Sequence, residues 1–386
     1  MASGRKILFL PRWYPSDNDP QNGVFIRKHA QAAALLNEVV VLIAEPVQGP
    51  GRITIARQEN LTEIIVYYPK RKLGLGKILA YLLALRQGWQ IIRQSGFSPQ
   101  LSHVEVIGRQ ALLALWLYYR HQVPYVVTEH WSGYLTGQFQ RKALIARWFS
   151  AWVLRRAAAV SVVSEILKKG MAACGLRMDY CILPNVVEVL TQSKMAPVSE
   201  KFTFLVVADL RDEVKNISGI IRAFARVYQD NKNMRLVIAG DGPDRTRLLN
   251  LVHQTGIAEA VIFKGRLHNQ QVQELIAACH VVIVNSFTET FSVITLEAIF
   301  TGRPVIATRC GGPEQFVHAD NGMLIPPGNE IALAEAMISI YENYHRYPPE
   351  RVRLSVPHQF SLQAVAQTME RFYSKAGVLK TVIAEA

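Results

Sequence analysis

Residues 281–298 read VVIVNSFTETFSVITLEA, and this stretch joins a strand, a polar loop and the start of a helix. The run VVIV predicts a strand that is buried on both faces. Glu289 lies in the loop just before the helix, and Glu297 follows eight residues later on the helix flank. The amides at the helix start belong to Phe291, Ser292 and Val293. These amides and the positive end of the helix dipole suit a diphosphate, and the neighbouring carboxylates suit sugar hydroxyls.

The same alternation of short β-branched runs and segments of helical period extends over the whole chain. Most of the runs are continuously apolar, as expected of parallel strands that helices cover on both faces. We expect strands at residues 6–10, 39–43, 63–68, 101–104, 125–128, 159–164, 181–183, 204–207, 235–239, 260–263, 281–284, 304–307 and 323–325. The sequence therefore predicts an α/β protein with two doubly wound parallel sheets that face each other across a cleft.

Residues 184–197 mark the expected boundary between two domains, because they lack a clear periodicity and carry prolines at both ends. We predict an N-terminal Rossmann-like domain, a second Rossmann-like domain, and a C-terminal helix that packs back toward the first domain. Their boundaries are residues 1–187, 188–356 and 357–386.

The chain has 386 residues and a formal net charge of +13. Residues 1–185 hold 23 basic and 10 acidic residues, whereas residues 186–386 hold 20 of each, so the first half carries the whole excess. A positive charge on one side predicts an anionic partner. No recognisable nucleic-acid-binding module accompanies the charge, so nucleic acid is not the expected partner.

Two segments of the first half combine basic residues with an apolar helical face. The residues of the first are Lys70, Arg71, Lys72, Lys77, Ile78, Leu82, Leu85, Trp89 and Ile92, and those of the second are Arg141, Lys142, Leu144, Arg147, Trp148, Trp152, Arg155 and Arg156. Such helices can rest on an anionic membrane surface. The apolar faces also fit a protein core, and a polyanionic glycan would attract the same charge.

Targeting and metal-binding patterns are not found. The start MASGRKILFLP has only four consecutive apolar residues before Pro11, fewer than a signal peptide needs. Arginines interrupt both of the most hydrophobic segments, which argues against a membrane-spanning helix. The four cysteines form no C-x-x-C pair. We expect a cytoplasmic protein that can associate with the cytoplasmic face of a membrane.

The remaining motifs of the second half follow in a characteristic order. They are AGDGP at 239–243, AIFTGRPVIATRCGGPE at 298–314, NG at 321–322 and PPG at 326–328. Together with the stretch that contains Glu289 and Glu297, this order closely resembles the donor half of glycosyltransferase family 4. Members of that family are retaining enzymes of GT-B fold. The resemblance implies that the domain of residues 1–187 binds the acceptor and that the domain of residues 188–356 binds the nucleotide-sugar donor. The resemblance is strong from about residue 206 to residue 328 and weaker over the rest of the chain.

The resemblance implies roles for the matching residues. Glu289 should contact the donor sugar, Glu297 the ribose hydroxyls, and the amides of residues 291–293 the diphosphate. A basic pair usually neutralises the departing phosphates, and Lys215 matches its lysine. Asp209 stands where an arginine is frequent, so Arg211, two residues later, is the alternative for the second cation. Ser292 stands where the family commonly has glycine.

Other glycines and acids in motif-like positions leave alternatives open. Gly240 and Gly242 form a single G-x-G after a strand, which is either a structural turn or a ligand loop facing the cleft. Gly23 matches the family's glycine-bearing first loop, which approaches the donor phosphates. In the same loop, residues 17–19 read DND, but their proline-flanked setting favours a turn over a metal site.

His130 is the predicted catalytic residue of the first half. It ends a buried strand beside Glu129, and ligand crevices of α/β sheets lie at that end of the strands. Relatives often place a histidine here in contact with the transferring sugar. His103 and Glu105 at the end of another strand form a second pair, for which a structural and a functional role are equally compatible.

The predicted function is retaining transfer of a sugar from a nucleotide diphosphate-sugar to a hydroxyl of a glycan or lipid-linked acceptor. No metal and no cofactor are expected. Lys215, with Arg211 as second cation, would stabilise the leaving diphosphate, and Glu289 and His130 would serve the sugar. Two alternatives remain open: a non-catalytic scaffold that binds a glycan or a membrane, and a GT-B-fold epimerase or phosphorylase.

Overall fold

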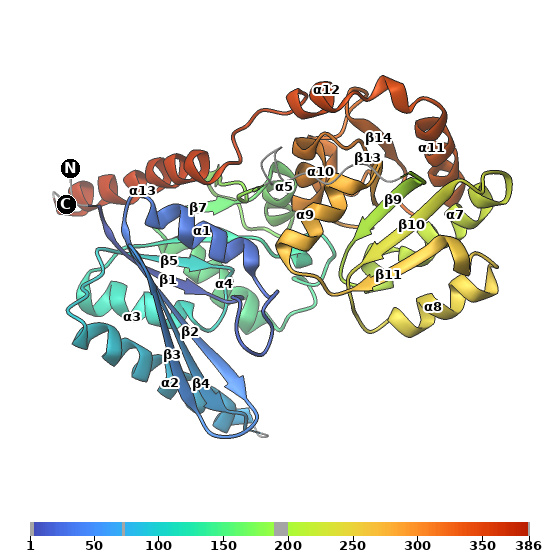
Figure 1. Cartoon of the computed structure of the whole chain (residues 1–386). Coiled ribbons are helices and arrows are strands. Elements are labelled where there is room, and N and C mark those ends of the chain that lie inside the picture. Colours follow the sequence, from blue (N-terminus) through green and yellow to red (C-terminus); the bar gives the residue numbers. More distant parts are fainter. Residues whose placement is uncertain (1–3, 72–73, 189–199, 385–386) are drawn as a thin grey trace. The chain divides into compact units, whose positions relative to one another are not determined.

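The computed structural model describes three stretches of the chain, residues 4–71, 74–188 and 200–384 (Figure 1). It divides into two units, Met1–Val186 with Gln359–Ala386, and Val187–His358. The division falls within the predicted boundary at 184–197, of which residues 189–197 lie outside the described residues. Each unit is built on its own sheet, as the alternating sequence pattern predicts.

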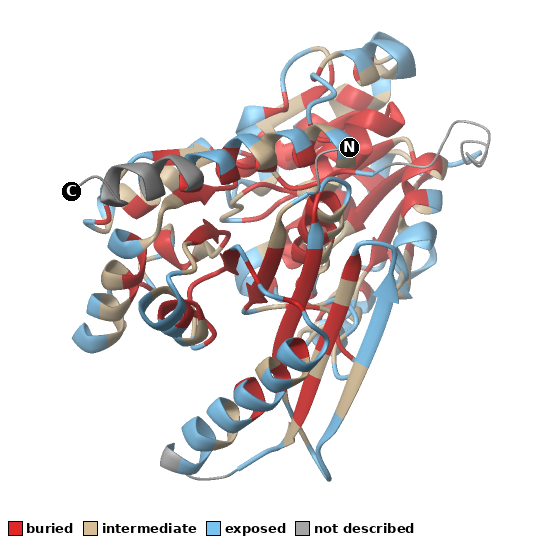
Figure 2. Cartoon of the chain, turned by 90° about the vertical axis from the view of Figure 1, so that its left-hand side faces the viewer, coloured by how far each residue is buried: buried red, intermediate tan, exposed pale blue. Residues whose placement is uncertain are grey.

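The first unit has an eight-stranded sheet in the order β3-β4-β2-β1-β5-β6-β7-β8. Its strands are β1 (Lys6–Pro11), β2 (Glu38–Val47), β3 (Arg52–Gln58), β4 (Leu61–Pro69), β5 (Leu101–Glu105), β6 (Tyr125–Glu129), β7 (Ala159–Val162) and β8 (Tyr180–Ile182). All neighbours are parallel except β3 and β4. The central strands are buried along their length (Figure 2), which explains their continuous apolar sequence.

Strand β3 is not among the predicted strands. It pairs antiparallel with β4 through a turn in which Glu59 adopts a left-handed conformation. Its sequence RITIARQ is mostly exposed, as Figure 2 shows for this edge of the sheet. A strand that buries neither face needs no continuous apolar run, and the β-branched residues Ile53, Thr54 and Ile55 are the one strand signal in this sequence.

Helices cover both faces of the first sheet. They are α1 (Val24–Ala34), α2 (Gly74–Gln94), α3 (Ala111–His121), α4 (Leu144–Arg156), α5 (Glu165–Ala173) and α13 (Leu362–Ala384). Helix α13 comes from the C-terminal end of the chain and packs beside α1 (Figure 1). Arg5 Nη1 lies 2.5 Å from Glu370 Oε2, and the Tyr373 hydroxyl lies 2.9 Å from His103 Nδ1. These contacts make the C-terminal helix part of the first unit's core.

The second unit has a six-stranded, fully parallel sheet in the order β11-β10-β9-β12-β13-β14. Its strands are β9 (Phe202–Val207), β10 (Met234–Ala239), β11 (Val261–Gly265), β12 (Val281–Val284), β13 (Val305–Thr308) and β14 (Gly322–Ile325). Its helices are α6 (Asp212–Lys215), α7 (Ile217–Asp230), α8 (Arg245–Gln254), α9 (Asn269–Ala278), α10 (Val293–Thr301), α11 (Glu330–Glu342) and α12 (Pro349–Leu354).

Helix α7 shows why this unit packs as it does. Its apolar residues recur at helical spacing, so that Ile217, Ile220, Ile221 and Phe224 share one buried face. This face packs against α11 and the sheet. Each such side chain stabilises the fold by about 1.5–3 kcal/mol through its burial. Arg226, Gln229 and Asp230 of the same helix are exposed.

The strand order reverses once in each sheet. In the second unit β9 lies next to β12, and in the first unit β1 lies next to β5. The loops that follow these neighbouring strands separate at their carboxyl ends, and ligands of α/β proteins bind at such reversal points. The two reversal points are therefore the places to look for functional side chains.

The two basic amphipathic segments prove to be mixed in their burial. On α2, Leu85 and Ile92 belong to the core, whereas Ile78 and Leu82 are exposed. On α4, Leu144 and Trp148 are largely exposed and Val153 and Leu154 fill the core instead. Lys72, which belongs to the predicted basic cluster, lies outside the described residues. Among the described residues, no helix combines the length and apolar character needed to cross a membrane.

Candidate functional site

The second sheet brings Lys215 and Glu289 together at its reversal point. Lys215 ends the short helix α6 after β9, and Glu289 lies in the loop after β12. Lys215 Nζ is 2.5 Å from Glu289 Oε1. The two predicted residues are thus neighbours although 74 positions separate them in the sequence. Burial would lower the pKa of Lys215, but the Glu289 carboxylate raises it above its usual value, so the lysine is a permanent cation.

Hydrogen bonds hold the loop of Lys215 against the loop of Glu289. Asn216, directly after Lys215, adopts a left-handed conformation with φ of 47°, and its carbonyl accepts a bond from Asn285 Nδ2 at 3.0 Å. The amide of Phe287 donates to the carbonyl of Val214 at 2.9 Å. These bonds fix the backbone on both sides of Lys215, and the contact with Glu289 orients its ammonium.

Glu289 is fixed by the loop that follows β13. Its amide donates to the carbonyl of Cys310, and its carbonyl accepts from the amide of Gly312, each at 2.9 Å. The hydroxyl of Ser286 donates to Glu289 Oε1 at 2.7 Å. The carboxylate therefore points in one direction, and its second oxygen has no part in these contacts.

The start of helix α10 is built as an anion-binding end. Ser292, the residue before the helix, has φ of 69°, a left-handed conformation that favours glycine. This conformation explains why glycine is common at this position in the family that the sequence resembles. The Ser292 hydroxyl bonds to Thr295 Oγ1 at 2.8 Å, and no side chain caps the helix. The amide of Thr295 donates to the carbonyl of Ser292 at 3.2 Å, and the amides at the helix start point outward as at other helix N-termini.

The backbone of Phe291 and the loop after β13 approach each other closely. A Cβ atom on Gly312 would lie 2.6 Å from the backbone carbon of Phe291. The ring of Phe291 is buried and packs on Phe316 with the ring centroids 5.4 Å apart. This packing fixes the backbone that precedes the helix. Glu297, one turn further into α10, is 6% exposed and thus nearly buried.

Arg211 is placed differently from Lys215. It is exposed, and its Nε lies 3.1 Å from Asp209 Oδ2, so the two residues of the alternative basic position pair with each other. Exposed pairs of this kind contribute less than about 1 kcal/mol. Arg211 makes no ion pair with Glu289 in the described part of the chain, and its assignment as second cation stays a prediction.

Gly240 and Gly242 pack against the loop that follows β9. A Cβ atom on Gly240 would lie 1.8 Å from the carbonyl oxygen of Ala208, and one on Gly242 would lie 2.7 Å from that of Leu210. The amide of Leu210 donates to the carbonyl of Asp241 at 3.0 Å. These contacts explain why glycine stands at both positions, because a side chain at either one would prevent the two loops from lying against each other.

Replacing Gly240 with alanine is therefore expected to destabilise the protein by more than about 2 kcal/mol. The new methyl group would meet a backbone oxygen, in addition to the cost of φ at 141°. Chemical denaturation measures this loss. Gly256→Ala is the matched control, since Gly256 also has a positive φ but no atom within 4 Å of its Cβ position. Equal losses for the two variants would contradict the close approach.

In the first unit, His130 belongs to a buried cluster around Glu105. His130 Nε2 is 2.7 Å from Glu105 Oε2, and His29 Nδ1 is 3.1 Å from Glu105 Oε1. Burial would raise the pKa of Glu105, but the surrounding histidines lower it below its usual range. Burial lowers the pKa of His130 in spite of Glu105, so His130 is neutral at pH 7 and donates through Nε2. Its Nδ1 then carries a lone pair that has no partner in the described structure.

His103 belongs to the same cluster and is fully buried. Its ring nitrogens lie 2.9 Å from the Tyr373 hydroxyl and 2.6 Å from Thr128 Oγ1. The sequence left its role open between structure and function. Because both nitrogens are bonded to groups of the core, the structure favours the structural role.

The burial of His103 makes stability depend on pH. Burial lowers its pKa to about 4, below the unfolded value of about 6.5, so the unfolded chain binds more protons between these values. Stability is full above pH 6.5 and falls as the pH drops toward 4, by about 2 kcal/mol at pH 5 for this histidine. Urea denaturation of the first unit at pH 7.5 and 5 checks this fall.

The matched variants are His103→Gln, which should show a smaller fall, and His121→Gln, which changes an exposed histidine of the same unit. An unchanged fall in His103→Gln would show that other groups cause the loss of stability.

Gly23 and the DND sequence have local roles in the first loop. Gly23 precedes α1 with φ of 67°, and a Cβ atom there would lie 2.5 Å from the backbone of Trp13. Asp17 pairs with Arg52 at 2.8 Å, and the carbonyl of Asp19 accepts bonds from two amides of a turn. The loop is thus an ordered turn that glycine permits.

The group of described residues that could hold a metal ion is His29, Glu105 and His130, whose ligand atoms lie within 4.8 Å of one another. Their separations of 2.7 and 3.1 Å are hydrogen-bond lengths. His29 also contacts the carbonyl of Pro184 through Nε2 at 3.0 Å. Bonds among the residues account for the arrangement, and the expected absence of a metal stays a prediction.

Sequence reasoning missed His29 and two cations near the reversal point of the first sheet, Arg12 and Arg109, and it placed Lys142 only in a basic segment for a membrane surface. His29 lies within an amphipathic helix, where its pattern is that of a core position. The cations lie on different elements and meet only in the fold. The signal that could have found them is the position of Arg12 and Arg109 directly after two strands that the topology makes neighbours.

Known proteins resemble this chain over one half or over the whole length. It is 34% identical over 164 residues to N-acetyl-alpha-D-glucosaminyl L-malate synthase of Bacillus anthracis, a match that spans 42% of each chain. Two solved structures have 18% identity to it. Sucrose-phosphate synthase of Thermosynechococcus elongatus has a TM-score of 0.76 and covers 99% of this chain and 100% of its own. HepE of Anabaena in complex with UDP and glucose has a TM-score of 0.74, with coverages of 96% and 99%.

Models of two protein families match consecutive parts of the chain. The glycosyl transferase 4-like domain matches residues 28–185, and Glycosyl transferases group 1 matches residues 191–355. These segments correspond to the two units of the structure. The chain belongs to the group 1 glycosyltransferases of family 4 and has the GT-B fold.

Proposed function

We propose that this protein transfers a sugar, with retention of configuration, from a nucleotide diphosphate-sugar to a hydroxyl of a glycan or lipid-linked acceptor. The observation that carries the proposal is the pair of Lys215 and Glu289, 2.5 Å apart, beside the uncapped start of α10. The fold supports a nucleotide-sugar donor, because HepE, which shares it, binds UDP and glucose.

Lys215 and the amides at Phe291, Ser292 and Val293 stabilise the negative charge that develops on the leaving diphosphate. When the bond between the sugar and the diphosphate breaks, negative charge grows on the leaving phosphate oxygens. A fixed cation and fixed amides stabilise this charge without having to reorganise. Arg211 is the second cation of this proposal. Its exposed position leaves it able to turn from Asp209 to a phosphate.

Glu289 stabilises the positive charge that develops on the donor sugar, and its carboxylate is held by Ser286 and Lys215. The Glu289 carboxylate accepts a hydrogen bond from a hydroxyl of the donor sugar as the sugar becomes oxocarbenium-like. The acceptor oxygen then bonds to the anomeric carbon on the face that the diphosphate leaves, and a leaving phosphate oxygen takes the acceptor proton. Glu297 accepts hydrogen bonds from the ribose hydroxyls, and His130 Nδ1 accepts a hydrogen bond from a hydroxyl of the sugar.

The proposal is tested with the purified chain and a panel of UDP-, GDP-, ADP- and dTDP-sugars. We expect one donor to release its nucleoside diphosphate slowly to water and faster with an acceptor. Proton NMR of the product should show the anomeric configuration of the donor, and an excess of EDTA should leave the rate unchanged. An inverted product would contradict retention, and a loss of rate with EDTA would contradict metal independence.

The alternative functions give different results in the same assay. A non-catalytic scaffold binds nucleotide without releasing diphosphate from any donor. An epimerase changes the donor sugar without needing an acceptor, and a phosphorylase requires inorganic phosphate. Any of these outcomes would replace the proposed transfer.

A further inference from the structure

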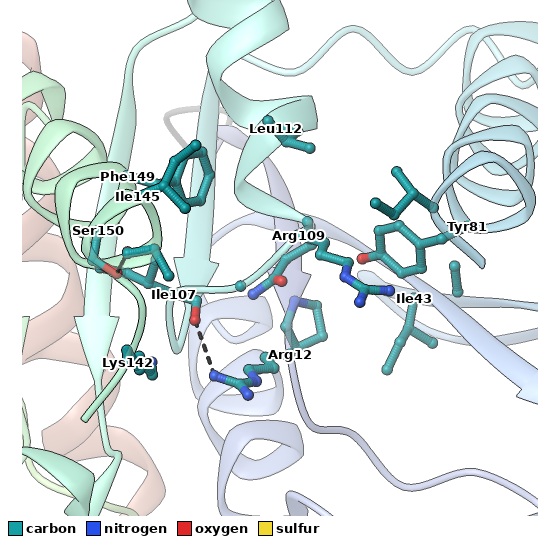
Figure 3. Close-up of a pocket in the computed structure, with 16 residues that line it drawn as sticks. Arg12, Ile43, Tyr81, Ile107, Arg109, Leu112, Lys142, Ile145, Phe149 and Ser150 are labelled. Carbon is teal, nitrogen blue, oxygen red and sulfur yellow. Dashed lines mark hydrogen bonds between the residues drawn. The ribbon is translucent and has the colours of Figure 1, made fainter. Parts of the chain in front are cut away.

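The first unit contains a pocket of about 790 Å³ that the donor chemistry does not explain (Figure 3). It lies at the reversal point of the first sheet, where Arg12 follows β1 and Arg109 follows β5. Residues of α2, α3 and α4 complete its wall. Its position is the one at which α/β sheets bind their ligands.

The loop after β5 is held in a strained conformation at this pocket. Val106 has φ of 62°, which a β-branched residue adopts only at a cost. The side chain of Gln110 donates to the carbonyl of Val106 at 2.6 Å, and the amide of Ile107 donates to Glu129 Oε1 at 2.8 Å. Bonds from buried side chains thus impose a backbone shape that the sequence alone would not adopt. Strained residues of this kind are most common at active sites and ligand-binding sites.

Three cations face the pocket, and the buried carboxylate of Glu129, which interacts with Arg12 and Lys142, does not line it. Arg12 lies between Lys142 and Arg109 in the view of Figure 3. Arg12 Nη1 donates to the carbonyl of Ile107 at 3.2 Å, and Lys142 Nζ lies 3.8 Å from the centre of the Trp131 ring. In the described part of the chain none of the three forms an ion pair, and no Asp or Glu lines the pocket.

The pocket is unfavourable for the charge of Lys142. Burial and the neighbouring charge of Arg12 lower the pKa of Lys142, and the carboxylate of Glu129 opposes this effect only in part. Glycine at position 108 leaves room for the Arg12 side chain, because a Cβ atom on Gly108 would lie 3.1 Å from Arg12 Cδ. An anion bound among the three side chains would supply the missing charge.

The other wall of the pocket is apolar and continues onto the surface. Ile78, Leu112, Ile145 and Phe149 line it, and Figure 3 shows Ile145 and Phe149 together on one side, away from Arg109. Leu144 and Ile145 are 77% exposed and Trp148 is 63% exposed at the start of α4. Neighbouring exposed apolar side chains of this kind are typical of a binding surface.

We propose that this pocket binds the acceptor and that the acceptor is a phosphate-bearing lipid. Its phosphate would lie among Arg12, Arg109 and Lys142, and its aliphatic chain would follow Ile78 and Ile145 out along the exposed apolar residues. A soluble glycan would leave the apolar wall in water, and an uncharged lipid would leave the three cations without an anionic partner inside the pocket. The assignment as acceptor rests on the proposed function, whereas the binding of such a lipid does not.

Binding of dodecyl phosphate to the full chain, measured by calorimetry below its micellar concentration, tests the proposal. We expect it to bind at least 100-fold more tightly than inorganic phosphate, since each buried methylene strengthens binding about fourfold. Dodecanol should bind at least tenfold more weakly than dodecyl phosphate, because it lacks the charge.

Two pairs of variants locate the site. Arg109→Gln should weaken binding of dodecyl phosphate about tenfold, whereas Arg120→Gln, at the exposed end of α3, should not change it. Ile145→Ser should weaken binding, whereas Leu79→Ser, an exposed position outside the pocket, should not. Equal effects within either pair indicate adsorption to the surface and overturn the proposal.

The outcomes separate this proposal from the proposed function. If the chain binds nucleoside diphosphates but binds dodecyl phosphate no better than inorganic phosphate, the lipid site is wrong and the transferase remains. If dodecyl phosphate binds with the expected variant effects but no donor releases its diphosphate, the transferase is wrong and the lipid site remains. Transfer of the donor sugar to a sugar linked to a long-chain alkyl phosphate, at a rate that Arg109→Gln reduces, would support both the transferase and the lipid site.

Discussion

Lys215→Ala is expected to lower kcat about 100- to 1,000-fold while the protein stays folded. The ammonium lies 2.5 Å from Glu289 at the mouth of α10, and it is the cation best placed to stabilise a leaving diphosphate. A fixed group that stabilises charge in the transition state contributes an effect of this size. The rate of nucleoside diphosphate release at saturating donor measures it, with circular dichroism as the check of folding.

Two further variants separate charge from hydrogen bonding and from general damage. Lys215→Gln keeps a donor but loses the charge, so it should recover only a small part of the rate. Lys201→Ala removes an exposed lysine of the same unit and should leave the rate unchanged. A folded Lys215→Ala protein with full kcat would remove Lys215 from the mechanism.

Glu297→Ala is expected to abolish measurable transfer and to weaken the binding of the nucleoside diphosphate about 100-fold. The side chain is nearly buried on α10, and two ribose hydroxyls that donate to its carboxylate would each contribute about 1.5 kcal/mol. Titration calorimetry with the nucleoside diphosphate measures the affinity, and the transfer assay measures the rate.

Glu297→Gln retains the shape and one acceptor oxygen and should bind the nucleotide with an intermediate affinity. Glu335→Ala, which removes an exposed carboxylate from helix α11, serves as the control and should bind normally. Normal nucleotide affinity in a folded Glu297→Ala protein would show that this carboxylate does not contact the ribose.

The parts of the fold that bury apolar surface were predictable from sequence. The run VVIV at 281–284 is a central parallel strand because it is covered on both faces, and its neighbours follow the same rule. Strand β3 was not predictable, since an exposed edge strand needs no apolar pattern. Whether Ile78 and Leu82 face the core could not be predicted either. They share one apolar face of α2 with Leu85 and Ile92, and only the latter two are buried.

For the site, spacing and family resemblance identified Glu289, Glu297 and Lys215 as a group. The contact between Glu289 and Lys215 could not be derived, because it depends on the adjacency of β9 and β12. The positive φ of Ser292 and the close approach of Gly240 to Ala208 depend likewise on how loops meet. Sequence patterns describe each element's own surface, and contacts between distant loops follow only from the topology.

Hydrogen exchange at the start of α10 tests the central claim most directly. The chain is incubated with the nucleoside diphosphate that most raises its Tm, and exchange of the amides in residues 289–298 is followed by mass spectrometry. The account predicts that exchange of these amides slows when the nucleotide is bound and that Lys215→Ala reduces this protection. Saturable nucleotide binding that leaves their exchange unchanged would contradict it.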